Sequence, residues 1–303
     1  MGTDVAHGRQ LVRSRSLAVR MAFLVVAIPL FVVAAAAAIV IYLPRGWLLA
    51  LVAGTVIGAL ARAFKHRREQ RAPLNGHVLE LEEDPDLFAI VDRLCALVDI
   101  VRPELVASEL RQPNSWVIHR PGKPPRLFIT RDLRELLTPE ELQAVVGHEL
   151  THIANRDALV MTIVGTPGAI LLNARGGGVD QFLMALVGAV ASLGTAMLGR
   201  YRELAADAGS AAIVGRPSAL AAALLKISDS QQGIPRDDLR AGAALNAFNL
   251  VAVVPDKRPW LLRFRPIARA VRSHPDLKTR IEALQRLEAR QQSPPRLASP
   301  IRR

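Results

Sequence analysis

The longest uncharged segment of this chain constrains its fold more than any other feature. Residues 21–43 contain no charged side chain, and roughly 20 apolar residues in a helix suffice to cross a bilayer core of about 30 Å. The apolar region of a cleaved signal peptide is shorter, and here a second apolar block, residues 47–61, follows at once. Because Pro-Arg-Gly at 44–46 favours a tight turn, we expect a transmembrane hairpin over residues 21–61.

Basic residues flank this hairpin on both sides and indicate its orientation. Residues 1–20 hold four arginines, and the segment 62–76 holds five basic residues. The positive-inside rule therefore places the N-terminus and the basic linker 62–76 in the cytoplasm, with Arg45 outside. These clusters explain much of the net charge of +12. Since no base-reading module is recognisable, we expect no nucleic-acid partner.

Two further apolar stretches, residues 158–172 and 182–198, leave two interpretations open. They are either buried or membrane-surface helices, or a second hairpin that turns at the glycine-rich residues 173–178. Neither stretch has a polar stripe, which favours membrane association over 158–198. At the other end of the chain, the composition of residues 291–303 predicts a disordered tail.

The sequence predicts a small sheet and a helix ahead of the second apolar region. Strands are expected at residues 77–81, 115–119 and 126–130. Asp84-Pro85 is typical of a helix N-cap followed by proline at the first helical position, and the helix should reach about residue 99. The one cysteine, Cys95, lies in the apolar pattern of that helix. A single cysteine excludes a disulfide within the chain and a cysteine-based zinc site.

The segment GHELTHIANRD, residues 147–157, carries the order H-E-x-x-H on a helix with a clear start. Thr138, Pro139 and Glu141 fit a capping box with proline at the first helical position. The apolar face of this helix repeats at spacings of four, four and three: Leu142, Val146, Leu150 and Ile153. The two histidines lie together on a different face, so they are free to reach an ion.

Histidines at i and i+4 can bind one metal ion, because imidazoles on neighbouring turns lie close together. Zinc accepts the nitrogens of His148 and His152, and Glu149 can take a proton from a water molecule that the metal activates. A catalytic zinc needs a third protein ligand. In YRELAAD, Glu203 and Asp207 are also four apart and offer a ligand and a carboxylate that orients a histidine. A solvated helix face is the other interpretation of that spacing.

Taken together, these segments resemble the HtpX heat-shock membrane proteases of bacteria, which share a gluzincin family with the CAAX prenyl proteases. The resemblance covers nearly the whole chain: the N-terminal hairpin, HELTHIANRD, the hydrophobic block, RELAAD and SHPDLKTRI. It implies a multi-pass membrane protein of the α+β class, mainly α, with a gluzincin-like zinc protease domain over residues 77–290. It also implies a bacterial inner-membrane location with the active site facing the cytoplasm.

The resemblance assigns roles to individual residues. It makes His148, His152 and Glu203 the ligands of one zinc ion per chain. Glu149 becomes the general base, and Asp207 the partner of a zinc histidine.

Two residues outside the zinc-binding segments acquire roles only through the resemblance. His274, in the late His-Pro motif that Arg280 follows, would help to stabilise the oxyanion, whereas the residues alone favour a neighbour of a helix N-cap or a surface residue. Asn114 would lead into an edge strand beside the substrate. Such a strand can hold an extended peptide by backbone hydrogen bonds with little demand on its sequence.

We therefore expect a membrane-bound zinc endopeptidase that hydrolyses misfolded or damaged membrane and cytoplasmic proteins in protein quality control. Polypeptide substrates and the lipid bilayer are the expected partners, and the sequence predicts no particular oligomeric state. The alternative is a non-catalytic membrane adaptor that keeps the zinc fold to bind polypeptides. The intact Glu149 argues against the adaptor, because only catalysis requires that carboxylate.

Overall fold

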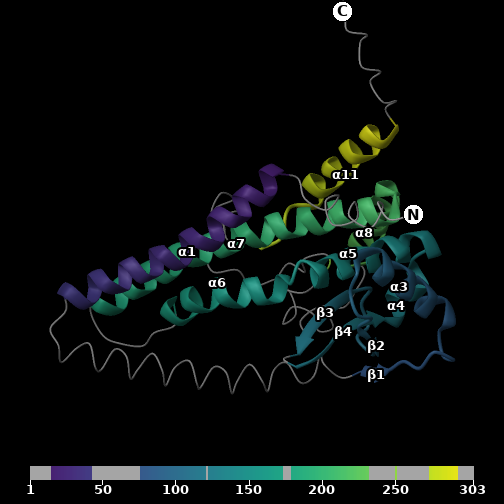
Figure 1. Ribbon diagram of the computed structural model, residues 1–303, viewed down its shortest axis with the longest axis horizontal. Helices are drawn as coiled ribbons and strands as arrows, with labels where there is room; N and C mark the ends of the chain where they lie inside the picture. The colour runs from purple at the N-terminus through teal and green to yellow at the C-terminus, as the bar shows by residue number, and fades with distance from the viewer. Residues whose placement is uncertain are drawn as a thin grey trace, which may run out of the picture.

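The computed structural model describes residues 15–42, 76–120, 122–172, 179–231, 250 and 273–292 of the 303-residue chain. The helices are α1 (Arg15–Tyr42), α3 (Pro85–Val98), α4 (Arg131–Leu136), α5 (Pro139–Ala154), α6 (Asp157–Leu172), α7 (Val179–Val214), α8 (Pro217–Gln231) and α11 (Leu277–Gln292). The strands are β1 (Gly76–Val78), β2 (Glu104–Ser108), β3 (Ser115–Arg120) and β4 (Lys123–Thr130). The prediction of a mainly helical α+β fold is confirmed (Figure 1).

The four strands form one small mixed sheet in the order β1-β2-β4-β3. β2 runs parallel to β4, and the other two pairs are antiparallel. The sequence predicted strands near β1, β3 and β4 but missed β2. Both faces of β2 are largely buried, so its sequence lacks the alternation that marks a half-exposed strand. β4 begins earlier than predicted, at Lys123. Pro124 and Pro125 are tolerated in this strand because they lie outside the stretch paired with β2 and beside the irregular end of β3.

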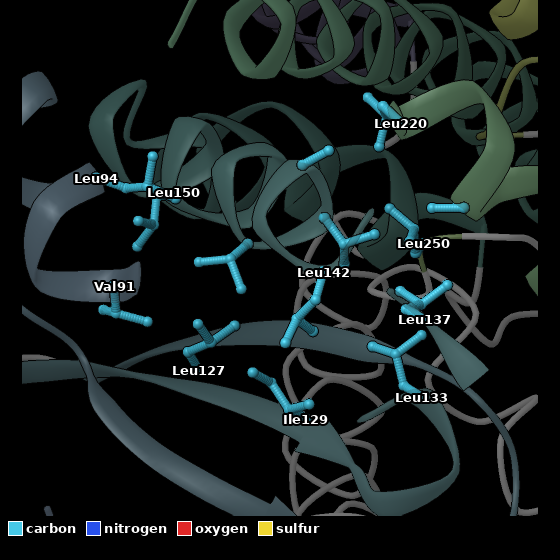
Figure 2. Close-up of a cluster of buried hydrophobic side chains, with 14 of the residues drawn as sticks. Val91, Leu94, Leu127, Ile129, Leu133, Leu137, Leu142, Leu150, Leu220 and Leu250 are labelled. Atoms are coloured by element: carbon cyan, nitrogen blue, oxygen red, sulfur yellow. The ribbon is translucent and has the colours of Figure 1, made fainter. Parts of the chain in front are cut away.

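One face of the sheet and the helices above it form the main hydrophobic core (Figure 2). Leu127 of β4 faces Leu142 and Leu150 of α5, and Val91 and Leu94 of α3 close the side of this layer. All five side chains are at most 1% exposed. The sheet is therefore a platform that fixes the position of α5.

The start of α5 agrees with the prediction. Thr138 accepts a hydrogen bond from the backbone N–H of Glu141 (3.3 Å), and the Glu141 carboxylate accepts one from the N–H of Thr138 (2.9 Å). This reciprocal capping box, with Pro139 at the first helical position, satisfies amides that a helix start leaves without partners. Asp84 caps α3 in a similar way, by accepting from the N–H of Leu87.

Three helices, α1, α6 and α7, lie side by side and extend beyond the sheet (Figure 1). Small residues allow them to approach closely: a Cβ on Gly194 of α7 would lie 2.8 Å from the Ile28 side chain of α1, and one on Gly168 of α6 would lie 2.9 Å from Ala191. The apolar stretch 182–198 and the segment that carries Glu203 belong to one continuous helix of 36 residues.

Parts of the predicted membrane topology fall outside the described residues. α1 covers most of the first apolar block, but residues 43–75, which include the second block and most of the basic linker, are not described; nor is the turn 173–178. Two described helices contain windows long and apolar enough to span a membrane, Ala18–Ala35 and Leu183–Val214. α11 extends through Gln292, two residues into the predicted tail 291–303, and the rest of that tail lies outside the described residues.

Candidate active site

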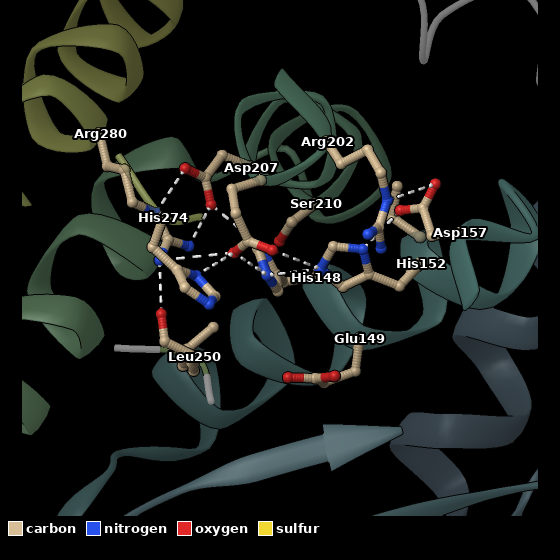
Figure 3. A network of polar contacts seen from close by, with 12 residues as sticks. His148, Glu149, His152, Asp157, Arg202, Asp207, Ser210, Leu250, His274 and Arg280 are labelled. Atoms are coloured by element: carbon tan, nitrogen blue, oxygen red, sulfur yellow. Dashed lines mark hydrogen bonds and ion pairs between the residues drawn. The ribbon is translucent and has the colours of Figure 1, made fainter. Parts of the chain in front are cut away.

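The crossing of α5 and α7 brings His148, His152 and Glu203 together. Figure 3 labels the two histidines of this group. The Nε2 atoms of His148 and His152 are 3.1 Å apart. The Glu203 carboxylate from α7 lies 3.7 Å from Nε2 of His148 and 3.6 Å from Nε2 of His152. The donor atoms of His148, His152 and Glu203, the candidate ligand group, all lie within 4.8 Å of one another, so each could reach a common central ion.

The second nitrogen of each histidine faces a buried carboxylate. Nδ1 of His148 lies 3.0 Å from Oδ1 of Asp207, and Nδ1 of His152 lies 2.6 Å from Oδ2 of Asp157. A carboxylate at Nδ1 keeps the proton on that nitrogen and leaves Nε2 free to bind a metal. Two imidazoles and one carboxylate are a donor set that suits zinc, so the residues present fit the expected ion.

The charge of the surroundings also suits a cation. Burial lowers the pKa of His148, but the carboxylates of Asp207 and Glu203 outweigh burial and raise that pKa to about 9. The same carboxylates that stabilise a positive charge on an imidazole would stabilise a metal ion in its place.

Each supporting carboxylate is in turn paired with an arginine. Arg280 of α11 donates two hydrogen bonds to Asp207, from Nε (2.8 Å) and Nη2 (2.6 Å), and one to the carbonyl of Leu250 (2.5 Å). Nε of Arg202 lies 3.1 Å from Oδ1 of Asp157. These pairs fix the carboxylates in place, because a buried carboxylate needs a partner for its charge.

Glu149 follows His148 in the chain and lies below His148 and His152 in Figure 3. Its side chain is buried at 3% exposure, and the hydroxyl of Ser115 donates a hydrogen bond of 2.8 Å to its Oε1. Burial raises the pKa of this carboxyl, while the nearby His148 and His152 oppose the rise. A carboxylate with a raised pKa is a better proton acceptor at neutral pH than an exposed one.

His274 also reaches this group, with its Nδ1 3.5 Å from Oε2 of Glu203. The chain comes close to α7 at this point because residue 199 is glycine. A Cβ on Gly199 would lie 2.8 Å from the carbonyl oxygen of Ser273. His274 is 7% exposed, so it lies inside the site and not on the surface that its local sequence favoured.

The structure places Asn114 directly before β3 and buries it. Its backbone N–H donates to the hydroxyl of Thr130, and its side-chain oxygen accepts from the N–H of Leu250. Asn114 thus ties the start of β3 to β4 and to residue 250. The next residue, Ser115, makes the contact with Glu149.

Comparison with known proteins agrees with this geometry. The model of Peptidase family M48 matches residues 81–288, which is more than half of the chain and includes the ligand group. The chain belongs to peptidase family M48. It is therefore a metallopeptidase, as the resemblance predicted.

Curated relatives extend the similarity of this M48 peptidase beyond the matched domain. The chain is 35% identical over 292 residues to Protease HtpX homolog 1 of Streptomyces coelicolor, covering 90% of this chain and 93% of that protein. It is 38% identical over 226 residues to a Protease HtpX homolog of Moorella thermoacetica, covering 68% and 73%. The predicted resemblance to HtpX-type proteases is confirmed.

Among solved structures, Ste24p of S. mikatae is similar, with a TM-score of 0.48 and 16% identity. That match covers 76% of this chain and 57% of the Ste24p chain.

Sequence reasoning did not single out three residues of this M48 site: Ser115, Asp157 and Arg202. Asp157 ends the segment GHELTHIANRD, and Arg202 precedes Glu203 in YRELAAD. Both lie within the two segments whose motifs predict the metal site. Ser115 had no local signal, because its contact with Glu149 spans 34 positions of the chain.

Proposed function

We propose that this M48 peptidase is a zinc endopeptidase embedded in the bacterial inner membrane. It hydrolyses peptide bonds of unfolded or damaged proteins at the cytoplasmic face. The observation that carries the proposal is the ligand group His148, His152 and Glu203 beside a buried Glu149.

In the proposed reaction, bound zinc supplies Lewis acidity toward a water molecule and the scissile carbonyl. Glu149 accepts a proton from the attacking water and returns it to the leaving amine. Ser115 holds Oε1 of this carboxylate, which leaves Oε2 for the proton transfer. His274, at the edge of the ligand group, donates a hydrogen bond to the oxyanion as negative charge develops on the carbonyl oxygen.

The sheet supports the proposal that the substrate is an extended polypeptide. Among the described strands, β3 pairs only with β4 and forms an edge of the sheet. An extended peptide can add to such an edge by backbone hydrogen bonds, which make little demand on side chains. Because Ser115 of β3 also contacts Glu149, a peptide on this edge would lie beside the proposed base. This arrangement favours unfolded chains of many sequences.

The long helices support the membrane location. Only 11% of the apolar window in α1 and 33% of that in α7 are buried, whereas the core helix of a soluble protein is mostly buried. Large apolar side chains are exposed on these two helices and on α6, among them Phe23, Leu30, Leu159, Ile163 and Leu186. Glu203 lies about 30 Å along α7 from Leu183, which is about the thickness of a bilayer core. This length would place the ligand group at the membrane border, within reach of water.

The direct test is metal analysis and proteolysis of the full-length protein purified in detergent. We expect about one zinc ion per chain and cleavage of unfolded casein, abolished by a chelator and restored by zinc. A compactly folded soluble protein should resist cleavage under the same conditions. If the zinc-loaded protein binds unfolded casein but never cleaves it, the endopeptidase proposal is wrong and the adaptor interpretation returns.

A further inference from the structure

We infer that Asp157 is a positioning residue for His152, and that Arg202 holds Asp157 in place for this role. The inference rests on the proposed function, since it takes His152 as a metal ligand. The inference concerns a second supporting carboxylate, in addition to that of Asp207. The three residues come from three helices, because His152 lies on α5, Asp157 on α6 and Arg202 on α7.

Both oxygens of Asp157 are engaged by side chains from other helices. Oδ2 lies 2.6 Å from Nδ1 of His152, and Oδ1 lies 3.1 Å from Nε of Arg202 (Figure 3). The Asp157 side chain is 2% exposed. An acidic residue in the first turn of a helix usually interacts with that helix's own amides. Here the carboxylate instead links the neighbouring helices, so its buried position is better explained by His152 than by α6.

The turn between α5 and α6 directs Asp157 back toward His152. Asn155 and Arg156 separate the two helices, and the N–H of Arg156 donates to the carbonyl of Ile153 (3.0 Å). Arg156 has a φ of 54°, a left-handed conformation that is uncommon for a residue other than glycine. Such conformations persist where the surrounding structure holds them and are concentrated at functional sites. The chain thus keeps an unfavourable backbone conformation immediately before Asp157.

The other zinc histidine has a matching arrangement. His148 faces Asp207, which is paired with Arg280, just as His152 faces Asp157, which is paired with Arg202. In both cases an imidazole, a carboxylate and a guanidinium follow one another in that order. The likeness indicates that Asp157 orients the ring and keeps the proton on Nδ1, while Arg202 keeps the carboxylate in position.

The test measures metal affinity rather than proteolysis. All variants are made in full-length protein with Glu149→Gln, which prevents self-digestion, and are titrated with Zn²⁺ and Co²⁺ in detergent. We expect Asp157→Asn to raise the zinc Kd by about 10- to 100-fold and Arg202→Met by about tenfold. The Co²⁺ absorption spectrum should change in both variants, because the orientation of a ligand changes. The double variant should bind no more weakly than Asp157→Asn alone, since Arg202 acts through Asp157.

The matched control is Asp92→Asn. This change removes a carboxylate from an exposed pair with Arg102, whose Nη1 lies 3.0 Å from Oδ2 of Asp92. It should leave the zinc Kd and the Co²⁺ spectrum at their parent values.

Parent values of the zinc Kd and the Co²⁺ spectrum in Asp157→Asn would overturn the inference. If that variant does not fold, Arg202→Met decides instead, and a parent Kd there would overturn it equally. Failure of the proposed function would be seen in a different measurement. The zinc-loaded wild type would then not cleave casein, while the ratio of each variant's zinc Kd to that of the parent would stay as expected.

Discussion

The two helices that build the ligand group, α5 and α7, differ in almost every other respect. α5 has 16 residues, begins at a capping box and lies on the sheet with its apolar face buried. α7 has 36 residues, and its first half is apolar with many exposed side chains. One site can thus combine a helix held by burial on a sheet with a helix that contains an apolar window long enough to span a membrane. Ligands from both helices must then hold their relative positions.

The largest effect should follow from removing the ligand that α7 supplies. Glu203→Ala leaves two histidines without the carboxylate between them, so we expect zinc affinity to fall by more than about 100-fold and proteolysis to be lost. Metal content after dialysis and casein cleavage measure the two effects. Glu282→Ala, which changes an exposed glutamate on α11, serves as the control. Stoichiometric zinc in Glu203→Ala would show that α7 is not part of the metal site.

The base that α5 supplies can be separated from metal binding. Glu149→Gln should lower the rate of casein cleavage by about a thousandfold, because general-base catalysis contributes on this scale. Zinc content should stay near that of the wild type, since Glu149 is not among the three donor residues. Glu140→Gln changes an exposed residue in the first turn of the same helix and should be neutral. Undiminished, chelator-sensitive cleavage by Glu149→Gln would exclude its role as base.

A smaller effect should follow from a methyl group on α7. In Gly199→Ala the new Cβ meets the backbone oxygen of Ser273, so the segment that carries His274 must move. We expect casein cleavage to fall by about 10- to 100-fold with zinc retained, because small displacements near the reacting groups are costly. Gly165→Ala on α6 is the matched control, since its Cβ would meet only a side-chain methyl of Thr195, at 3.2 Å. Equal activity of both variants would contradict the proposed role of His274.

The smallest effect concerns the start of α5 and involves no chemistry. Thr138→Ala removes the acceptor for the N–H of Glu141 and should destabilise the protein by about 1 kcal/mol. The midpoint of thermal unfolding should fall by no more than about 2–4 °C, because the shift becomes smaller as the chain becomes longer. Thr138→Ser keeps a hydroxyl and should remain close to the wild type. A loss of zinc in Thr138→Ala would contradict this expectation, because it would show that metal binding depends on the capping box at the start of α5.

The same comparison explains what the sequence could predict. The start and the apolar face of α5 were predicted correctly, because capping and spacing are local features that the core then preserves. α7 was predicted as separate segments, since its composition changes near Arg200 while its backbone continues as one helix. Strand β2 was missed because a strand buried on both faces has no alternation.

Within the site, local spacing indicated His148, Glu149 and His152, whereas Glu203 required the family resemblance to decide between two interpretations. The roles of Asp157 and Arg202 depend on how three helices pack, and no periodicity in the sequence encodes that packing. Ser115 illustrates the same limit, because it contacts Glu149 only when β3 packs against α5.

The continuity of α7 restricts how relatives of this protein can vary in length. Each inserted or deleted residue turns the rest of an α-helix by about 100° and shifts it by about 1.5 Å. An insertion between Gly194, which packs on α1, and Glu203 would therefore rotate the ligand away from the histidines. Insertions and deletions between Gly194 and Glu203 should survive selection only when they keep Glu203 on the same face of the helix. Changes that lie before Gly194 in the chain do not alter the spacing of these two residues.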